Sequence, residues 1–281
     1  MIVTVIGTGL IGGSMALSLK EKGLAQKVIG VDANTGHLAR AMELGIIDEY
    51  AALTHGVKEA DLVVLAIPVD AGVHLLPTIL NELNNKQVVM DVGSTKELIL
   101  SSVSSHPMRR RFVATHPMWG TEFSGPEAAE HGAFKGRAAV ICGSGEADAD
   151  ALALVEKVYE VLEMRKVYMD AASHDMHAAY VSHISHITSF ALANTVLEKE
   201  KEEDAIFTLA SGGFESTVRL AKSNPDMWVP ILRQNRENVL DVLNEHISQL
   251  RKFKSCLEKE NYSYLHELME QAGGIRRVLN K

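Results

Sequence analysis

The first candidate catalytic residue is a histidine that lies among polar neighbours within residues 115–122. The neutral imidazole of His116 can accept a hydroxyl proton while hydride leaves the adjacent carbon. Ser94, in a Gly-Ser-Thr-Lys sequence at 93–96, could orient that imidazole through its hydroxyl group. The same spacing also fits a turn histidine before Pro117 and a helix N-cap at Ser94.

A glycine-rich sequence near the N-terminus has the pattern of a dinucleotide-binding turn between a strand and a helix. Gly7 permits a tight turn, Gly9 lets the backbone approach a pyrophosphate, and Gly12 allows close helix packing. Asp32 ends the next strand, where a carboxylate binds the ribose hydroxyls of NAD and repels the 2′-phosphate of NADP. No arginine or lysine follows at 33–36, so NAD is favoured over NADP. A glycine turn with an unrelated surface aspartate is the alternative interpretation. The candidate cofactor contacts are Gly7, Gly9, Leu10, Ile11, Gly12 and Asp32, with Ser94 beside the nicotinamide.

Several histidines fall in one predicted helical region. His174 and His177 are three residues apart, as are His183 and His186, so each pair shares a helix face. A metal site is one interpretation, but only Asp175 offers a further ligand, and we expect no metal. Ordinary core or surface histidines are the simpler alternative.

A further polar region lies between residues 211 and 228. Its two glycines, Gly212 and Gly213, break the helical pattern. The guanidinium group of Arg219 suits a carboxylate, and Trp228 offers a large apolar surface. A turn between two helices is the alternative interpretation.

The elements that must position these residues alternate between strand and helix up to residue 169. Near-continuous apolar, β-branched runs between amphipathic helices indicate a parallel sheet covered on both faces. The candidate residues then follow the carboxyl ends of strands, the edge at which ligands bind in such sheets. The expected strands are 2–6, 27–31, 62–67, 87–92, 111–115, 137–142 and 165–169, and the expected helices are 14–22, 36–44, 71–83, 95–104 and 147–162.

From residue 170 to 281, helical periodicity replaces the strand pattern, so we expect two domains, 1–169 and 170–281. The longest expected helix, 229–259, carries an apolar stripe. Such a stripe usually packs into the core of its own domain, but an all-helical domain often buries it against a second, identical subunit. Its residues are Leu232, Val239, Leu243, Ile247, Leu250, Phe253 and Leu257.

The charge balance argues against nucleic acid or an anionic membrane as a partner, because 28 basic residues face 36 acidic ones. The basic run Arg109-Arg110-Arg111 is expected to be a solvated loop before a strand. Cys142 and Cys256 lie far apart, so neither disulfides nor zinc are predicted. No signal sequence or apolar run of membrane-spanning length is found, and we expect a cytoplasmic protein.

Taken together, five motifs resemble those of the prephenate/arogenate dehydrogenases, in order and over nearly the whole chain. The resemblance implies an α/β protein with an N-terminal Rossmann-type NAD-binding domain followed by an all-helical domain that forms a homodimer. It also implies NAD-dependent oxidative decarboxylation of prephenate to 4-hydroxyphenylpyruvate in tyrosine biosynthesis. The motifs are Gly7-Thr8-Gly9-Leu10-Ile11-Gly12; Gly93-Ser94-Thr95-Lys96; His116-Pro117-Met118 with Gly120-Thr121-Glu122; Ser182-His183-Ile184-Ser185-His186; and Gly212-Gly213-Phe214 with Arg219 and Trp228.

The resemblance also implies roles for individual residues. His116 would be the catalytic histidine that hydrogen-bonds the ring hydroxyl of the substrate. Ser94 would position its imidazole and touch the nicotinamide. Arg219 and His186 would bind the carboxylate and ring substituents of the substrate. Further substrate-site positions would be Glu122, Gly212 and Trp228, whereas His183 is expected to be structural.

One departure from the family pattern leaves the substrate open. Glu215-Ser216 stands where relatives more often carry an Arg-Asp pair, so arogenate, which would give tyrosine directly, is the alternative substrate. Another alternative is a β-hydroxyacid-type dehydrogenase, which would typically use a lysine where this chain offers His183 and His186. A non-catalytic NAD sensor is the third, and the combination of Ser94, His116, His186 and Arg219 argues against it.

Overall fold

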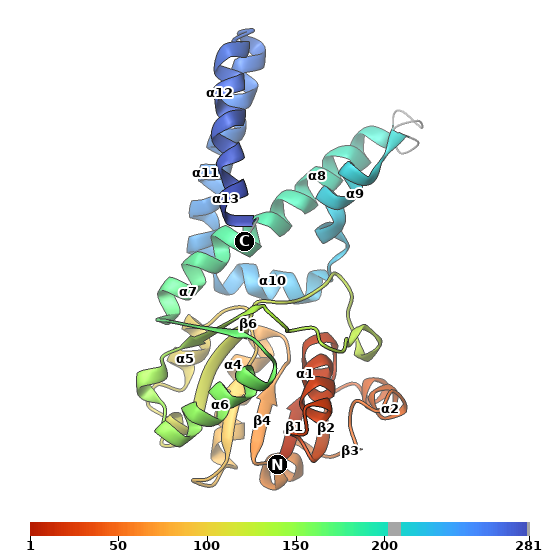
Figure 1. The fold of residues 1–281 in the computed structure, drawn as a ribbon, viewed down its shortest axis with the longest axis vertical. Coiled ribbons are helices and arrows are strands. Elements are labelled where there is room, and N and C mark those ends of the chain that lie inside the picture. The colour runs from red at the N-terminus through yellow and green to blue at the C-terminus, as the bar shows by residue number, and fades with distance from the viewer. Residues whose placement is uncertain (202–208, 280–281) are drawn as a thin grey trace. The chain divides into compact units, whose positions relative to one another are not determined.

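The computed structural model describes residues 1–201 and 209–279, and Figure 1 shows its fold. The chain divides into two compact units, Met1–Asn235 and Arg236–Lys281. All candidate site residues belong to the first unit. The domain division predicted at residue 170 stays a prediction: the last described strand ends at Met169, whereas the compact units divide after Asn235.

An eight-stranded sheet lies at the centre of the first unit, in the order β3-β2-β1-β4-β5-β6-β7-β8. Neighbouring strands are parallel except β6 and β7, so the prediction of a wholly parallel sheet is wrong at this pair. Parallel neighbours need a crossover, usually helical, but the connection from β6 to β7 holds only the 3₁₀ turn Pro126–Ala128. The strands are β1 (Ile2–Ile6), β2 (Lys27–Val31), β3 (Glu49–Tyr50), β4 (Leu62–Leu65), β5 (Val88–Asp91), β6 (Phe112–Pro117), β7 (Ala138–Cys142) and β8 (Arg165–Met169).

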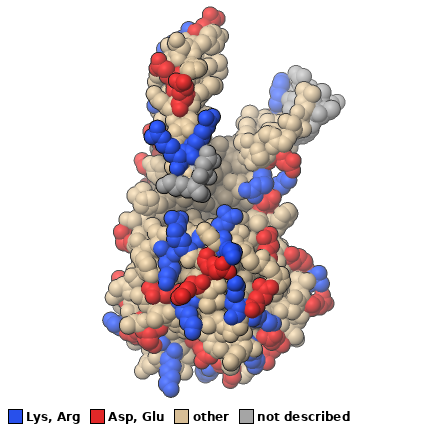
Figure 2. Space-filling model, in the orientation of Figure 1, with Lys and Arg blue, Asp and Glu red and all other residues tan. Residues whose placement is uncertain are grey.

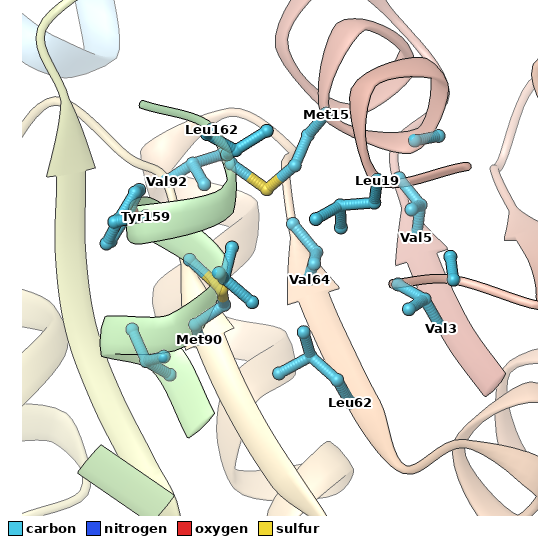
Figure 3. Packing of buried hydrophobic residues seen from close by; sticks show 14 of the residues in the cluster. Val3, Val5, Met15, Leu19, Leu62, Val64, Met90, Val92, Tyr159 and Leu162 are labelled. Carbon is cyan, nitrogen blue, oxygen red and sulfur yellow. The ribbon is translucent and has the colours of Figure 1, made fainter. Parts of the chain in front are cut away.

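Helices cover both faces of this sheet, which confirms the predicted α/β class. Strand side chains alternate between two apolar cores: Leu62 and Val64 belong to one, Val63 and Leu65 to the other. Figure 3 shows the first core, where Met15 and Leu19 of α1 and Tyr159 of α6 pack near Val3, Val5, Leu62, Val64 and Met90. The helices are α1 (Leu10–Glu21), α2 (Thr35–Glu43), α3 (Leu53–Glu59), α4 (Val69–Asn81), α5 (Glu97–Ser102) and α6 (Ala149–Val161).

The basic run at 109–111 is a 3₁₀ turn and not a solvated loop, because Arg109 and Arg111 are buried. Arg111 donates to Asp150 at 2.8 Å and to the carbonyl oxygen of Gln87 at 2.9 Å. Arg109 donates to the carbonyl oxygen of Phe112. The guanidinium groups thus supply donors to the two buried carbonyl oxygens, those of Gln87 and Phe112. On the face drawn in Figure 2, acidic and basic side chains of the first unit are interspersed.

Helices follow β8 in the first unit, as predicted. The expected helix 229–259 is interrupted: α10 ends at Gln234, and Asn235 leaves helical geometry to donate to the carbonyl oxygen of Asp175 at 2.6 Å. The elements are α7 (Ala171–Ala178), a π-helical turn (Ala179–His183), α8 (Ile184–Glu200), α9 (Gly212–Val218), a 3₁₀ turn (Arg219–Lys222) and α10 (Pro225–Gln234).

The second unit consists of helices in its described part: α11 (Arg236–Glu258), α12 (Tyr262–Ala272), a 3₁₀ turn (Gly273–Ile275) and α13 (Arg276–Leu279). Four apolar side chains of α11 are exposed: Leu240, Ile247, Leu250 and Leu257. They are spaced seven, three and seven residues apart, so they form a stripe along one face of the helix. Across residues 1–201 and 209–279, no helix is long and apolar enough to cross a membrane.

Candidate active site

The glycine turn after β1 contains two glycines that the packing of the chain requires and one, in front of α1, that it does not. Gly7 has φ +95°, and a Cβ there would lie 2.2 Å from the Ala66 oxygen. A Cβ at Gly12 would lie 2.1 Å from the Gly7 oxygen. At Gly9, by contrast, the nearest atom would be the Gly125 nitrogen at 3.9 Å, so the packing of the chain does not require glycine there.

That open position adjoins the N-terminus of α1, which Gly9 caps without a side-chain hydrogen bond. The first N–H groups of a helix have no partners within it, and the helix dipole favours an anion at this end. The turn therefore fits the pyrophosphate of a dinucleotide. Leu10 and Ile11 form the start of this helix and are partly exposed.

Asp32, directly after β2, is fixed against the same turn. Its carboxylate accepts hydrogen bonds from the Thr8 N–H at 3.0 Å, the Thr8 hydroxyl at 3.2 Å and the Asn34 N–H at 2.9 Å. An ionised carboxylate has about four acceptor sites, so capacity remains for a ribose hydroxyl. The residues present thus fit the ribose and phosphate parts of NAD.

His116 lies within β6, one residue before its end, and its side chain is only 9% exposed. It is therefore not the turn histidine of the alternative interpretation. Its Nδ1 lies 2.9 Å from Nε2 of His174 on α7. Burial lowers the pKa of His116 well below the usual value of 6.5, and electrostatic interactions with His174, Lys96 and His183 lower it further. The imidazole is therefore neutral at neutral pH.

Ser94 makes no hydrogen bond to His116 or to any other described residue, so the structure does not show it orienting the imidazole. The N-cap alternative for Ser94 is wrong, because α5 begins at Glu97 and Lys96 occupies the N-cap position. Ser94 lies partly exposed in the loop between β5 and α5.

A buried ion pair beneath this loop was missed at the level of sequence. Lys96 is fully buried and pairs with Asp91, whose carboxylate also accepts from the N–H groups of Gly93 at 2.9 Å and Thr115 at 3.0 Å. Asp91 therefore ties the Ser94 loop to β6, next to His116. The only signal in the sequence is an aspartate at a strand end followed five residues later by a lysine.

The rings of Trp228, His186 and His183 form a cluster. His186 stacks on Trp228 with ring centroids 3.5 Å apart, and His183 meets the same indole edge-on at 5.8 Å. Asn235 donates to Nδ1 of His183 at 3.2 Å. This leaves Nε2 of His183 and Nε1 of Trp228 as buried N–H groups without a hydrogen-bond partner in the described part of the chain.

Arg219 and Glu122 form an ion pair, with Nη1 2.6 Å from the carboxylate. The pKa of Glu122 is lowered by its own backbone N–H and by Arg219. Arg219 is about half exposed, with 48% of its side chain accessible. This pair connects the loop after β6 with the turn after α9.

Helix α10, which carries Trp228, is fixed at the carboxyl edge of the sheet, as Figure 1 shows near the end of β6. Gln234 accepts from the Thr95 hydroxyl at 2.7 Å and donates to Asp70 of α4 at 2.7 Å. Gly212, by contrast, is the exposed first residue of α9, and a Cβ there would have no neighbour within 4 Å among the described residues. No described contact brings Gly212 to the other candidates.

Comparison with known proteins gives matches over both halves of the chain. The model of the prephenate dehydrogenase nucleotide-binding domain matches residues 15–168, and that of the prephenate dehydrogenase dimerization domain matches 170–271. A prephenate dehydrogenase of Bacillus subtilis is 30% identical over 98% of this chain and 75% of its own length. A cyclohexadienyl dehydrogenase of Zymomonas mobilis is 28% identical over 99% of this chain and 95% of its own.

Solved structures agree with these matches. Prephenate dehydrogenase from A. aeolicus, in complex with hydroxyphenyl propionate and NAD+, has a TM-score of 0.87 at 30% identity and covers 100% of this chain and 98% of its own. Synechocystis arogenate dehydrogenase has a TM-score of 0.74 at 27% identity, with 99% of each chain covered. The chain belongs to the prephenate dehydrogenase family.

Proposed function

We propose that this protein is an NAD-dependent prephenate dehydrogenase, which converts prephenate to 4-hydroxyphenylpyruvate and CO2 on the pathway to tyrosine. The observation that carries this proposal is the buried, neutral His116 at the carboxyl edge of a sheet whose first turn fits a dinucleotide. The names of the relatives, and the NAD+ bound to the A. aeolicus enzyme, support the same chemistry.

The cofactor would lie along the glycine turn. Gly9 leaves room for the pyrophosphate, Leu10 and Ile11 present the start of α1, and Asp32 binds ribose hydroxyls. Ser94, which has no hydrogen-bond partner among the described residues, is available to the nicotinamide. NAD, when bound there, would supply the acceptor for the hydride that leaves the hydroxyl-bearing ring carbon.

His116 acts as the base in this proposal. Its neutral imidazole accepts the hydroxyl proton as hydride leaves the same carbon. The ring carboxylate then departs as CO2, and the electron pair of the broken C–C bond makes the ring aromatic. The proton returns to the oxygen, which becomes the phenol of the product, so atoms and charge balance.

Three groups are suited to the two carboxylates and the keto group of prephenate. Arg219 has donors beyond the one used by Glu122, and a guanidinium group binds carboxylates well. The unpaired N–H groups of His183 and Trp228 offer two more donors, each of which costs about 1–3 kcal/mol while it stays buried without an acceptor. His186, stacked on Trp228, completes this side of the site.

Arogenate is the second candidate substrate, and one observation favours it. Arogenate carries an ammonium group where prephenate carries a keto group, and α9 presents the exposed carboxylate of Glu215. Lys222 lies 4.0 Å from that carboxylate, and 73% of the Glu215 side chain is exposed, which leaves it accessible to a ligand.

We further propose a homodimer, supported by the match to a dimerization domain and by the exposed apolar stripe of α11. The cytoplasmic location and the placement of Gly212 at the substrate stay predictions from the sequence.

Product analysis tests the proposal. Purified protein is incubated with NAD and either prephenate or arogenate, and the products are separated by chromatography. We expect 4-hydroxyphenylpyruvate from prephenate. Tyrosine formed from arogenate at a higher rate would favour the second candidate, and no product from either would refute both.

A further inference from the structure

A series of hydrogen bonds links His116 to His174 and Asp175, and these two residues have no role in the reaction proposed above. Nδ1 of His116 meets Nε2 of His174 at 2.9 Å, and Nδ1 of His174 meets a carboxylate oxygen of Asp175 at 2.7 Å. All three side chains are buried, with exposed fractions of 9%, 2% and 2%. The two imidazole rings meet edge to face, with centroids 5.1 Å apart.

Donor and acceptor roles along this series of hydrogen bonds can be assigned by starting from Asp175. An ionised carboxylate only accepts, so Nδ1 of His174 carries the proton that it shares with Asp175. When the His174 imidazole is neutral, its other nitrogen is an acceptor, so Nε2 of His174 receives the Nδ1 proton of His116. Nε2 of His116 consequently has a free lone pair, and no described residue bonds to it.

Asp175 is itself held in place by backbone groups of another element. Its two carboxylate oxygens accept from the N–H of Lys96 at 2.7 Å and the N–H of Glu97 at 3.0 Å. Its carbonyl oxygen accepts from Asn235 at 2.6 Å. The aspartate is therefore fixed where α7 meets the loop that contains Ser94.

We propose that His174 and Asp175 are positioning residues that hold His116 in the Nδ1–H tautomer, so that Nε2 faces the substrate as the proton acceptor. This inference rests on the proposed function for the identity of the substrate. His174 touches neither substrate nor cofactor in this account; it acts through His116. The arrangement resembles the role of the aspartate in a serine-protease triad, which fixes the tautomer of a histidine.

The charged and titratable groups around His116 come from three elements. His174 lies on α7, His183 in the π-helical turn, and Lys96 before α5 with Asp91 as its partner. Asp175 is the acidic group in contact with His174. Loss of the His174 acceptor should therefore change the acid limb of the pH–rate profile as well as the rate.

The test compares His174→Leu, which removes the acceptor, with His174→Gln, whose amide oxygen can accept from His116. His177→Leu serves as the matched control, because His177 is exposed on the same helix. For each protein we would measure kcat, KM for prephenate, NAD affinity by fluorescence titration and melting temperature. Nitrogen-15 NMR of labelled histidines reports which ring nitrogen of His116 carries the proton, with His116→Gln used to assign the signal.

We expect His174→Leu to lower kcat by about 10–100-fold, the scale found for partners that orient histidine ligands, with NAD affinity unchanged. His174→Gln should recover most of this loss, and His177→Leu should behave as wild type. The NMR signal should place the His116 proton on Nδ1 in the wild type. Unchanged kcat in a folded His174→Leu, or a wild-type proton on Nε2, would overturn the inference. If wild type does not turn over prephenate, the proposed function fails, whereas the NMR measurement still decides the tautomer.

Discussion

Two buried histidines near the site, His116 and His183, are held in their neutral form. Burial lowers the pKa of His183 to about 4, against the opposing effect of Asp175, and it lowers that of His116 well below 6.5. In an unfolded chain both side chains would titrate near their usual value of about 6.5. The proposed chemistry needs neutral imidazoles. Burying them in the folded state lowers the stability of the protein at acid pH.

We therefore predict that the free energy of unfolding falls as pH drops from about 6.5 toward about 4.5, because the unfolded state binds protons that the folded state excludes. Each such histidine contributes a slope of up to about 1.4 kcal/mol per pH unit. Urea denaturation at about pH 5 and pH 7 measures this slope. His183→Asn should flatten it, whereas His266→Asn, at an exposed histidine of α12, should not. An equal slope in wild type and His183→Asn would contradict the assignment.

At this scale the sequence identified His116 through its motif but not its partner His174. Contact between them joins residues 58 positions apart, and spacing along the chain carries no information about that distance. Ser94, which lies closer in the sequence, was the expected partner. In the structure, Nδ1 of His116 instead forms a hydrogen bond with His174 on α7.

At the scale of elements, the turn between β1 and α1 contains a glycine that the packing requires and another that it does not. Gly12 is needed because a Cβ would strike the Gly7 oxygen, whereas Gly9 has room for one. Gly9 also has extended geometry, with φ −80° and ψ −157°, which any residue adopts. Only a ligand in front of the helix gives Gly9 a reason to lack a side chain.

Gly9→Ala should therefore keep the melting temperature close to wild type but weaken NAD binding by at least about tenfold, since a methyl group would occupy the pyrophosphate position. Gly12→Ala should lower the melting temperature instead, because the backbone must shift. Calorimetry and NAD titration on both variants separate the two effects. Full NAD affinity in Gly9→Ala would place the pyrophosphate elsewhere.

The turn after α9 brings Arg219 to Glu122, and this pair gives a second prediction at the same scale. Arg219→Ala should raise KM for prephenate by about 10–100-fold, the equivalent of one charge-assisted hydrogen bond, with a smaller effect on kcat. Lys222→Ala, on the same turn, is the matched control. Steady-state kinetics at saturating NAD distinguish these outcomes, and an unchanged KM would remove Arg219 from the substrate site.

Most strands and helices before residue 170 were predictable, because buried β-branched runs and amphipathic periods are local signals. Several of the exceptions have physical reasons. Strand β3 has only two residues, and the direction of β7 depends on a connection without a crossover helix. The expected helix 229–259 fails at Asn235, whose side chain binds Asp175, a tertiary contact that periodicity cannot reveal.

At the scale of the whole molecule, the exposed face of α11 indicates how the protein assembles. The exposed apolar side chains of α11 lie along one helix face, and exposed apolar stripes of this kind favour association. The match to a dimerization domain over residues 170–271 agrees with that expectation.

We predict a particle of twice the chain mass of 30.7 kDa in sedimentation equilibrium. Ile247→Glu combined with Leu250→Glu should shift the protein toward monomers, because charges at both positions would be costly to bury. Glu245→Gln, at an exposed position of the same helix, is the control. A monomeric wild type, or a dimer unaffected by the double variant, would contradict the proposed interface.

The role of His116 as the base is tested most directly by NADH formation, followed by absorbance, with prephenate and NAD in wild type and in His116→Ala. We predict turnover by wild type and a loss of about 10²–10⁴-fold in the variant, with NAD affinity unchanged. Wild-type rates in a folded His116→Ala would remove this histidine from the chemistry. NAD binding without turnover in wild type would contradict the assignment as a prephenate dehydrogenase.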